Sequence, residues 1–301
     1  MRVPDSLRVQ MMKISLSTAA ERLQRYQLEL ASGVRIQRPS DDPAGAQRIS
    51  NLNSNLSKIT QYLATANDAI AWLKSEDSAL GNMTDSLRQI RDDALQAANP
   101  DMGGTRETMV GHIKASVGFL LQSLNASDGA RFLFGGNKTQ TVPFNGDLTV
   151  GITYAGDDGE RRVALTDSIT LSLNHTGSEV TNLGGISDPT QPDLFQTLND
   201  LITAIQSGDQ TAIAVQIDTL DRHLERVLNI RGEAGIKLNQ AQLAMDQLSQ
   251  SRLILTSLLN ETESSDLTEV MIHLKEQENV MQAATYVAST LGQGGLLNWL
   301  K

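Results

Sequence analysis

One long seam of apolar residues limits what this chain can fold into. After Pro43 the apolar positions recur at steps of three and four, the heptad spacing of a helix that packs along its length against a partner. Its members are Ile49, Leu52, Leu56, Ile59, Leu63, Ala66, Ile70, Leu73 and Leu80, then, after a phase shift, Met83, Leu87, Ile90 and Ala94. At about 1.5 Å per residue this helix is roughly 75 Å long, so an elongated helical protein is expected.

The same spacing recurs on both sides of the middle of the chain and predicts further helices. It is present in segments 9–30, 110–124, 194–205, 213–259 and 267–291. Gly33 and Gly208 interrupt the pattern and are expected to end helices. Segment 213–259 is long enough to run antiparallel to the first long helix, so each half of the chain can fold back on the other.

The middle of the chain has a different pattern. Residues 148–154, LTVGITY, alternate apolar and polar side chains, which is typical of a strand. Asp158-Gly159 predicts a hairpin turn, and RRVALT (161–166) and SITLSL (168–173) are predicted as further strands. A small β domain is therefore expected between two helical halves.

The expected fold class is mainly α with a small β insertion. We predict an elongated, antiparallel long-helix bundle built from both chain halves, with coiled-coil termini and a central β domain. The predicted domains are a terminal coiled coil (1–42 with 265–301), a helical rod (43–140 with 193–264) and the β domain (141–192).

The two chain ends carry more apolar side chains than one pair of helices can cover. We therefore expect them to pack against partner chains and to be disordered in the monomer. The residues predicted to form this assembly interface are Leu7, Val9, Met12, Leu16, Leu23, Leu274, Met281, Leu291, Leu296, Leu297, Trp299 and Leu300.

The stretch GVRIQRPSDDPAGAQRI (33–49) is predicted to be a joint between two coils. Proline suits the first position of a helix and disfavours a helical conformation in the preceding residue, so Asp42 is expected to cap a helix that starts at Pro43. Asp41 then adds negative charge near the positive end of the helix dipole. This interpretation is favoured over a catalytic carboxylate pair, because no nucleophile lies nearby. The predicted hinge and cap residues are Gly33, Pro39, Asp41, Asp42 and Pro43.

Composition excludes several classes of protein. The 301 residues carry a formal net charge of −10, which argues against nucleic-acid binding, since that needs clustered Lys and Arg. There is no cysteine for a disulfide, a thiolate nucleophile or a cysteine-ligated zinc. No apolar stretch approaches the ~18 residues of a membrane span, and no cleavable signal peptide is predicted, so membrane insertion is not expected.

No motif supports an enzyme or a bound cofactor or metal. None of the four histidines, His112, His175, His223 and His273, has a second ligand at a metal-binding spacing. GGNKT (135–139) lacks the spacing of a phosphate loop, GDDGE (156–160) is too short for a calcium loop, and GEAG (232–235) has no preceding strand. We interpret GGNKT as a turn, GDDGE as a hairpin turn and GEAG as a helix kink or a close helix contact.

Several segments together resemble the flagellin superfamily of bacterial axial proteins and, within it, the hook–filament junction family. The matching segments are MRV (1–3), LASGVRIQRPSDDPAGA (30–46), DGARFLFGGNKTQTVPF (128–144), YAGDDG (154–159), HTGSEV (175–180), NIRGEAGIKLNQ (229–240) and SDLTEVMIHLKEQENVMQAATYVASTL (265–291). They cover nearly the whole chain in the family's order. The opening MRVPDSLRVQMMKIS is a few residues longer than the family's usual start.

The resemblance implies a structural component of the bacterial flagellum. Such a protein forms a homo-oligomeric ring between hook and filament, next to the first junction protein, and templates flagellin polymerisation. It also implies export without a cleaved signal peptide, through the flagellar type III apparatus with a dedicated chaperone, to an extracellular location. Two alternatives stay open: a flagellin-like filament subunit, and a soluble signalling coiled-coil protein.

Overall fold

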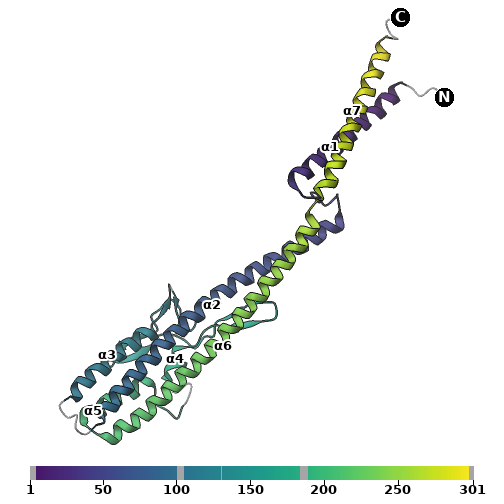
Figure 1. Ribbon diagram of the computed structural model, residues 1–301. Coiled ribbons are helices and arrows are strands. Elements are labelled where there is room, and N and C mark those ends of the chain that lie inside the picture. Colours follow the sequence, from purple (N-terminus) through teal and green to yellow (C-terminus); the bar gives the residue numbers. More distant parts are fainter. Residues whose placement is uncertain (1–4, 100–104, 130, 184–188, 298–301) are drawn as a thin grey trace. The chain divides into compact units, whose positions relative to one another are not determined.

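The structure is a computed structural model that describes residues 5–99, 105–129, 131–183 and 189–297. Helices dominate, and a few short antiparallel strands interrupt them, so the expected mainly helical class with a small β region is confirmed (Figure 1). In chain order the elements are α1 (Asp5–Ser32), α2 (Pro43–Ala97), α3 (Arg106–Leu124), β1 (Ser127–Asp128), β2 (Arg131–Phe132), β3 (Phe144–Asp147), β4 (Gly151–Tyr154), β5 (Arg162–Ala164), β6 (Thr170–Ser172), α4 (Gly177–Thr181), α5 (Leu194–Ser207), α6 (Gln210–Glu263) and α7 (Leu267–Leu297).

The long helices follow the predicted seams. The apolar spacing over 49–94 corresponds to α2, and the spacing over 213–259 corresponds to α6. Gly33 and Gly208 follow helix ends with φ of 69° and 74°, a left-handed backbone that glycine adopts without steric cost. Within the described ranges, no helix is both long enough and apolar enough to cross a membrane.

By their internal contacts the residues divide into two compact units. One unit is 59–251, and the other joins 1–58 to 252–301. Both unit boundaries fall inside long helices, one within α2 and one within α6.

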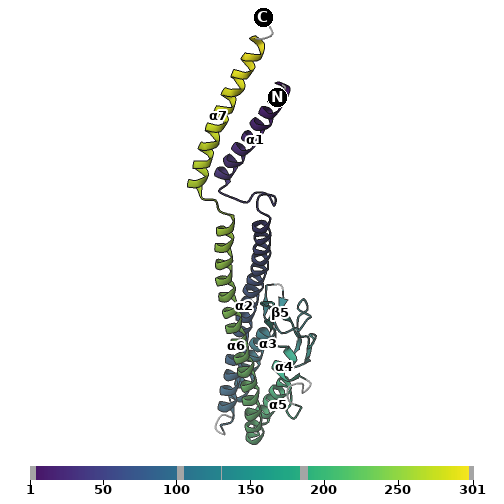
Figure 2. The same ribbon diagram turned by 90° about the vertical axis from the view of Figure 1, so that its right-hand side faces the viewer.

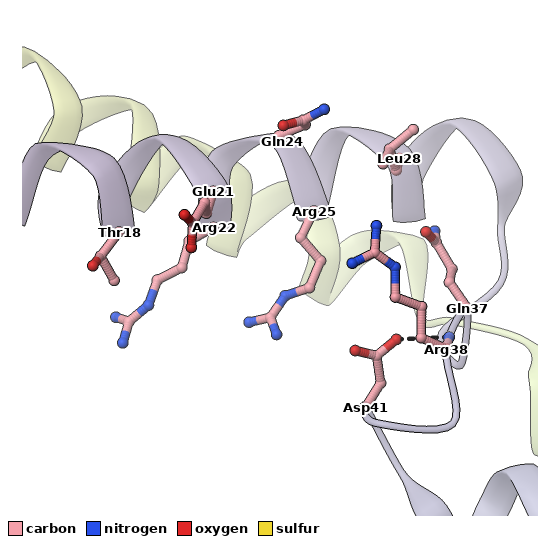
Figure 3. A pocket seen from close by; sticks show the side chains of 9 residues that line it. All are labelled: Thr18, Glu21, Arg22, Gln24, Arg25, Leu28, Gln37, Arg38 and Asp41. Atoms are coloured by element: carbon pink, nitrogen blue, oxygen red, sulfur yellow. Dashed lines mark hydrogen bonds between the residues drawn. The ribbon is translucent and has the colours of Figure 1, made fainter. Parts of the chain in front are cut away.

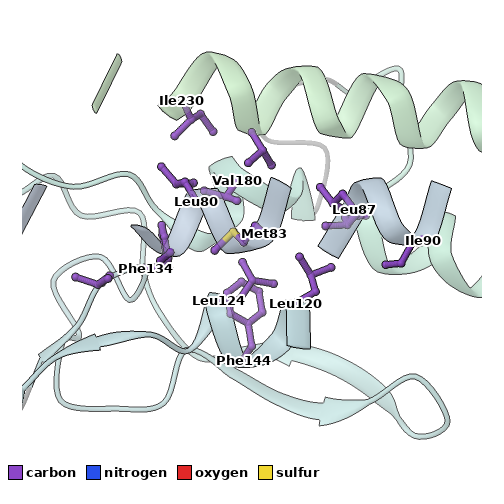
Figure 4. Close-up of a cluster of buried hydrophobic side chains, with 14 of the residues drawn as sticks. Leu80, Met83, Leu87, Ile90, Leu120, Leu124, Phe134, Phe144, Val180 and Ile230 are labelled. Atoms are coloured by element: carbon purple, nitrogen blue, oxygen red, sulfur yellow. The ribbon is translucent and has the colours of Figure 1, made fainter. Parts of the chain in front are cut away.

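The unit 59–251 has a continuous hydrophobic core. α2 contributes a row of fully buried side chains along one face, which packs on α3, on the segment that carries the strands, and on α6 (Figure 4). Labelled members are Leu80, Met83, Leu87, Ile90, Leu120, Leu124, Phe134, Phe144, Val180 and Ile230. Each fully buried side chain of this size stabilises the fold by about 1.5–3 kcal/mol, so this unit has an ample core of its own.

Ion pairs fix the register of α2 against α6. Arg91 donates from Nε and Nη2 to the two carboxylate oxygens of Asp221, at 2.5 and 3.2 Å, and Arg231 Nε lies 2.8 Å from Asp77 Oδ1. The lower-numbered residue of α2 pairs with the higher-numbered residue of α6, so the helices are antiparallel, as both ribbon views show (Figures 1 and 2). The four side chains are more than a third exposed, so these pairs define alignment more than they stabilise.

The strands differ from the prediction in two respects. They form three separate antiparallel pairs, β1 with β2, β3 with β4 and β5 with β6. The predicted strand over 148–154 is wrong in its first half, because residues 148–150 form a turn whose Thr149 and Val150 N–H groups donate to Asp147 Oδ1. The predicted hairpin turn at Asp158-Gly159 is also wrong, since β4 pairs with the preceding β3.

Candidate assembly site

The joint after α1 is held by the linker that joins α6 to α7. Arg35 N–H donates to the carbonyl of Glu263 at 2.8 Å, and Ser265 N–H donates to the carbonyl of Gly33 at 3.0 Å. Ser265 Oγ also donates to Glu29 Oε1 at 2.5 Å. Two linkers that lie more than 200 residues apart in sequence therefore form a short antiparallel pairing, centred on the bridge between Val34 and Ser264.

The second half of the joint is a turn followed by a helix cap. Arg38 N–H donates to Asp41 Oδ2 at 2.9 Å, and Asp41 N–H donates back to the carbonyl of Arg38. Asp42 Oδ1 accepts the N–H of Gly45 at 2.9 Å. Gly45 lies three residues after Asp42, in the first turn of α2, so this hydrogen bond has the geometry of a helix N-cap. That hydrogen bond and the nearby Arg35 guanidinium lower the pKa of the Asp42 carboxyl. Pro39 and Pro43, also predicted hinge residues, are exposed.

Gly45 is a sterically constrained position of the joint that the sequence pattern did not indicate. A Cβ added there would lie 2.4 Å from Ile36 Cδ1 and 2.5 Å from Asp42 Oδ2, far inside contact distance. Ile36 is buried, so it has little room to move away. The glycine therefore lets the linker lie directly against the first turn of α2.

The helices α1 and α7 lie side by side over much of their length (Figures 1 and 2). Five predicted interface residues, Met12, Leu16 and Leu23 of α1 with Leu274 and Met281 of α7, are half-buried. The seam is thus partly covered within one chain.

The other predicted interface residues divide into three groups. Leu7 is 42% exposed. Val9, Leu291, Leu296 and Leu297 lie in the described helices, but their side chains are outside the description, and Trp299 and Leu300 lie outside the described residues.

Further apolar side chains of the helix pair are about half exposed within the described part of the chain. Met11 and Ile14 of α1 are 58% and 61% exposed, and Val280 and Val287 of α7 are 49% and 47% exposed. A shallow groove of about 360 Å³ runs between the helices, lined by Met12 together with the two valines. Apolar side chains concentrated in this way are typical of protein–protein contact surfaces.

Next to the joint the same unit has a basic hollow of about 490 Å³. Figure 3 shows Arg22 and Arg25 of α1 extending from one side of the helix, with Arg38 and Asp41 of the joint facing the same space. Its lining is mostly polar, and the hollow is open to solvent.

The unit 59–251 contains buried polar groups that no motif had indicated. Glu76 of α2 is fully buried and accepts from the N–H of His175 at 3.0 Å and from its ring Nδ1 at 2.9 Å. Lys237 Nζ of α6 lies 3.0 Å from the other ring nitrogen. Burial lowers the pKa of His175, but the Glu76 hydrogen bond and charge outweigh it and raise the pKa above its ordinary value. The cluster ties the β region to both long helices.

Neither this cluster nor the other histidines of the described residues forms a group able to hold a metal ion. His223 is fully buried between Thr197 and Arg226, and His273 stacks on Tyr26 with 5.6 Å between ring centroids. GEAG lies inside α6, where a Cβ added to Gly232 or Gly235 would meet nothing within 4 Å, so the expected close helix contact is absent within the described chain. These histidines serve packing and hydrogen bonding.

Comparison with known proteins shows what the chain is similar to. Residues 7–139 match the family described as the bacterial flagellin N-terminal helical region. Flagellar hook-associated protein 3 of Escherichia coli K12 is 25% identical over 293 residues, which cover 90% of this chain and 90% of the relative. The chain is therefore similar to flagellins in its N-terminal helical region and to a hook-associated protein over most of its length.

Two further comparisons concern the fold and the extent of the match. The crystal structure of flagellar hook-associated protein 3 from Legionella pneumophila has the same fold, with a TM-score of 0.62 at 18% identity over 71% of this chain and 98% of that chain. A flagellin of Salmonella choleraesuis is 26% identical over 208 residues, which cover 67% of this chain but 37% of the flagellin. The chain thus matches a hook-associated protein over most of the length of both chains and a flagellin only in part.

Proposed function

We propose that this protein is a structural subunit of the bacterial flagellum that forms the junction between hook and filament. The observation that carries the proposal is the match to a hook-associated protein 3, which covers 90% of both chains. The matched flagellin has a large part with no counterpart here, since only 37% of it is covered. A junction role therefore fits better than that of a filament subunit.

The terminal helices supply the surface for this role. α1 and α7 leave Met11, Ile14, Val280 and Val287 about half exposed, and covering them with a neighbouring subunit yields roughly 25 cal/mol per Å² of buried apolar area. We propose that segments 1–42 and 265–301 acquire their final packing in a ring of identical subunits. The first junction protein then lies on one side of the ring and flagellin, whose polymerisation the ring templates, on the other.

The joint gives the terminal helices a defined direction at their base. The pairing of Arg35 and Gly33 with Glu263 and Ser265 links the two polypeptide segments at one level, and Asp42 caps α2 next to it. A joint of this kind lets the paired ends adapt to a neighbour without loosening α2. Delivery to this place by the type III export apparatus, with a dedicated chaperone and no cleaved signal peptide, completes the proposal.

Immunogold electron microscopy of intact flagella from the source organism tests it. Gold confined to a short zone where hook meets filament is the expected result. Gold along the whole filament would instead identify a flagellin variant. Labelling that never coincides with a flagellum would contradict a flagellar role and favour a soluble signalling protein.

A further inference from the structure

The basic hollow contains charges that the chain itself does not neutralise. Within the described residues, no carboxylate forms an ion pair with Arg22, Arg25 or Arg38. Arg25 lies 5.8 Å from the ring centroid of its neighbour Tyr26, and Asp41 is occupied with the backbone N–H of Arg38. Three guanidinium groups from two different elements thus share one open hollow of about 490 Å³ with two carboxylates, Glu21 and Asp41, so positive charge is in excess there.

The same unit has an opposite excess of charge elsewhere. Segment 261–278 carries six carboxylates and one lysine. Four of the six have partners: Glu269 and Glu276 flank His273, Glu278 pairs with Lys275, and Asp266 accepts the N–H of Thr268. The two that remain are Glu261 and Glu263.

Glu261 and Glu263 lie where negative charge is least favourable. They occupy the last turn of α6, and the C-terminal end of a helix already carries partial negative charge, which disfavours carboxylates there. Arg35 is close, but its guanidinium pairs with Asp42 and with the carbonyl of Thr262. The carboxylates of Glu261 and Glu263 therefore have no ion-pair partner in the described chain, and a cation from outside it would stabilise them.

From this complementarity we infer that the basic hollow of Arg22, Arg25 and Arg38 binds the acidic end of α6, at Glu261 and Glu263, of a second copy of this chain. The contact joins two different surfaces, which is the arrangement that generates a ring when the rotation between copies closes. Arginine suits it, since its planar group binds carboxylates with two parallel hydrogen bonds. The inference rests on the proposed ring, and it assigns the charged contact between neighbouring subunits of that ring.

A charge-swap experiment tests it with the full chain. Hooks isolated from cells that lack the protein are incubated with purified chains, and the bound fraction is measured after pelleting. The variant R22E/R25E and the variant E261R/E263R each place like charges in contact, so the bound amount of each should fall about tenfold or more. A mixture of the two variants restores opposite charges at every contact and should recover at least about half of wild-type binding.

The matched control for R22E/R25E is K13E/R48E, which makes the same change in net charge as R22E/R25E. Its two positions are exposed and belong to the same unit, but they lie outside the hollow. It should bind like wild type, and circular dichroism should give equal helicity for all four proteins. Wild-type binding together with full binding of R22E/R25E would overturn this inference and leave the junction role intact. Loss in both variants without recovery in the mixture would overturn the second copy as the occupant. Absence of wild-type binding would contradict the proposed function itself and this inference with it.

Discussion

His223 should make the unit 59–251 sensitive to mild acid. The side chain is fully buried, its Nδ1 lies 3.1 Å from Arg226 Nη1, and its Nε2 lies 3.3 Å from Thr197 Oγ1. Burial and the neighbouring guanidinium lower its pKa from 6.5 to about 4. Burial is the larger cause, because it disfavours the charged ring, and the arginine adds to it, because protonation would place two cations in contact.

The sign and size of the effect follow from proton linkage. Above pH 6.5 the ring is neutral in both states, and the stabilisation is fully present. Between pH 6.5 and 4 the unfolded chain binds a proton that the folded chain does not, so the free energy of unfolding falls as the pH falls. With these two pKa values the loss between pH 7 and pH 5 is about 2 kcal/mol.

The assay compares His223→Gln with wild type by urea denaturation at both pH values, followed by circular dichroism. Glutamine keeps a donor and an acceptor but does not titrate, so the variant should lack about 2 kcal/mol of the pH-dependent loss, whatever its stability at pH 7. His112→Gln, at an exposed position of α3, is the control and should keep the wild-type slope. A His223→Gln slope within about 0.5 kcal/mol of the wild-type slope would refute the linkage argument.

Three further outcomes are expected. Gly45→Ala should destabilise the joint by about 1–3 kcal/mol, because its Cβ meets the buried Ile36; thermal unfolding followed by circular dichroism measures this, and an unchanged midpoint would contradict it. Phe144→Ala should lower the urea midpoint by an amount equivalent to about 3–5 kcal/mol, since the ring is buried in the core, and a smaller cost than about 1 kcal/mol would argue against its place there. The double variant V280S/V287S should fold normally by circular dichroism yet bind isolated hooks poorly, whereas full binding would exclude this face from assembly.

The helices could be predicted from the sequence because the pattern that specifies them extends over only a few neighbouring residues. The three-and-four spacing of apolar residues records which side of a helix is buried, and the spacing over 49–94 predicted α2 with ends only a few residues from those observed. The contact of Asp42 with Gly45 spans three residues, so an Asp-Pro pair is enough to predict its position. Patterns of this range need no knowledge of the rest of the chain.

The β region was harder because its turns depend on distant partners. Asp157 Oδ1 accepts the N–H of Asn137, twenty residues earlier, as well as that of Gly159. This brings the segment after β4 back towards residue 137 and prevents Asp158-Gly159 from closing a hairpin. A dipeptide that often forms a turn gives no sign of such a competitor.

The candidate site was only partly visible for the same reason. Single residues such as Gly33 and Asp42 mark the joint, but the pairing of its linker with residues 263–265 joins opposite ends of the sequence. The convergence of Arg22, Arg25 and Arg38 likewise needs the turn between α1 and α2 to exist first. The predicted roles of the interface side chains at the extreme ends stay predictions.

The contrast in burial between the two units explains why one should fold alone and the other should need a partner. The connected core cluster lies entirely within residues 66–245, so its free energy is available to unit 59–251 without any neighbour. Outside that unit, Ala19, Ile36, Leu52 and Val270 are the buried apolar side chains of the described residues, and they are too few to offset the conformational entropy of long helices. This contrast supports the proposal that α1 and α7 obtain their missing apolar contacts from other chains. In the proposed ring, unit 59–251 is the folded body of each subunit, and the terminal helices complete their packing only against neighbouring subunits.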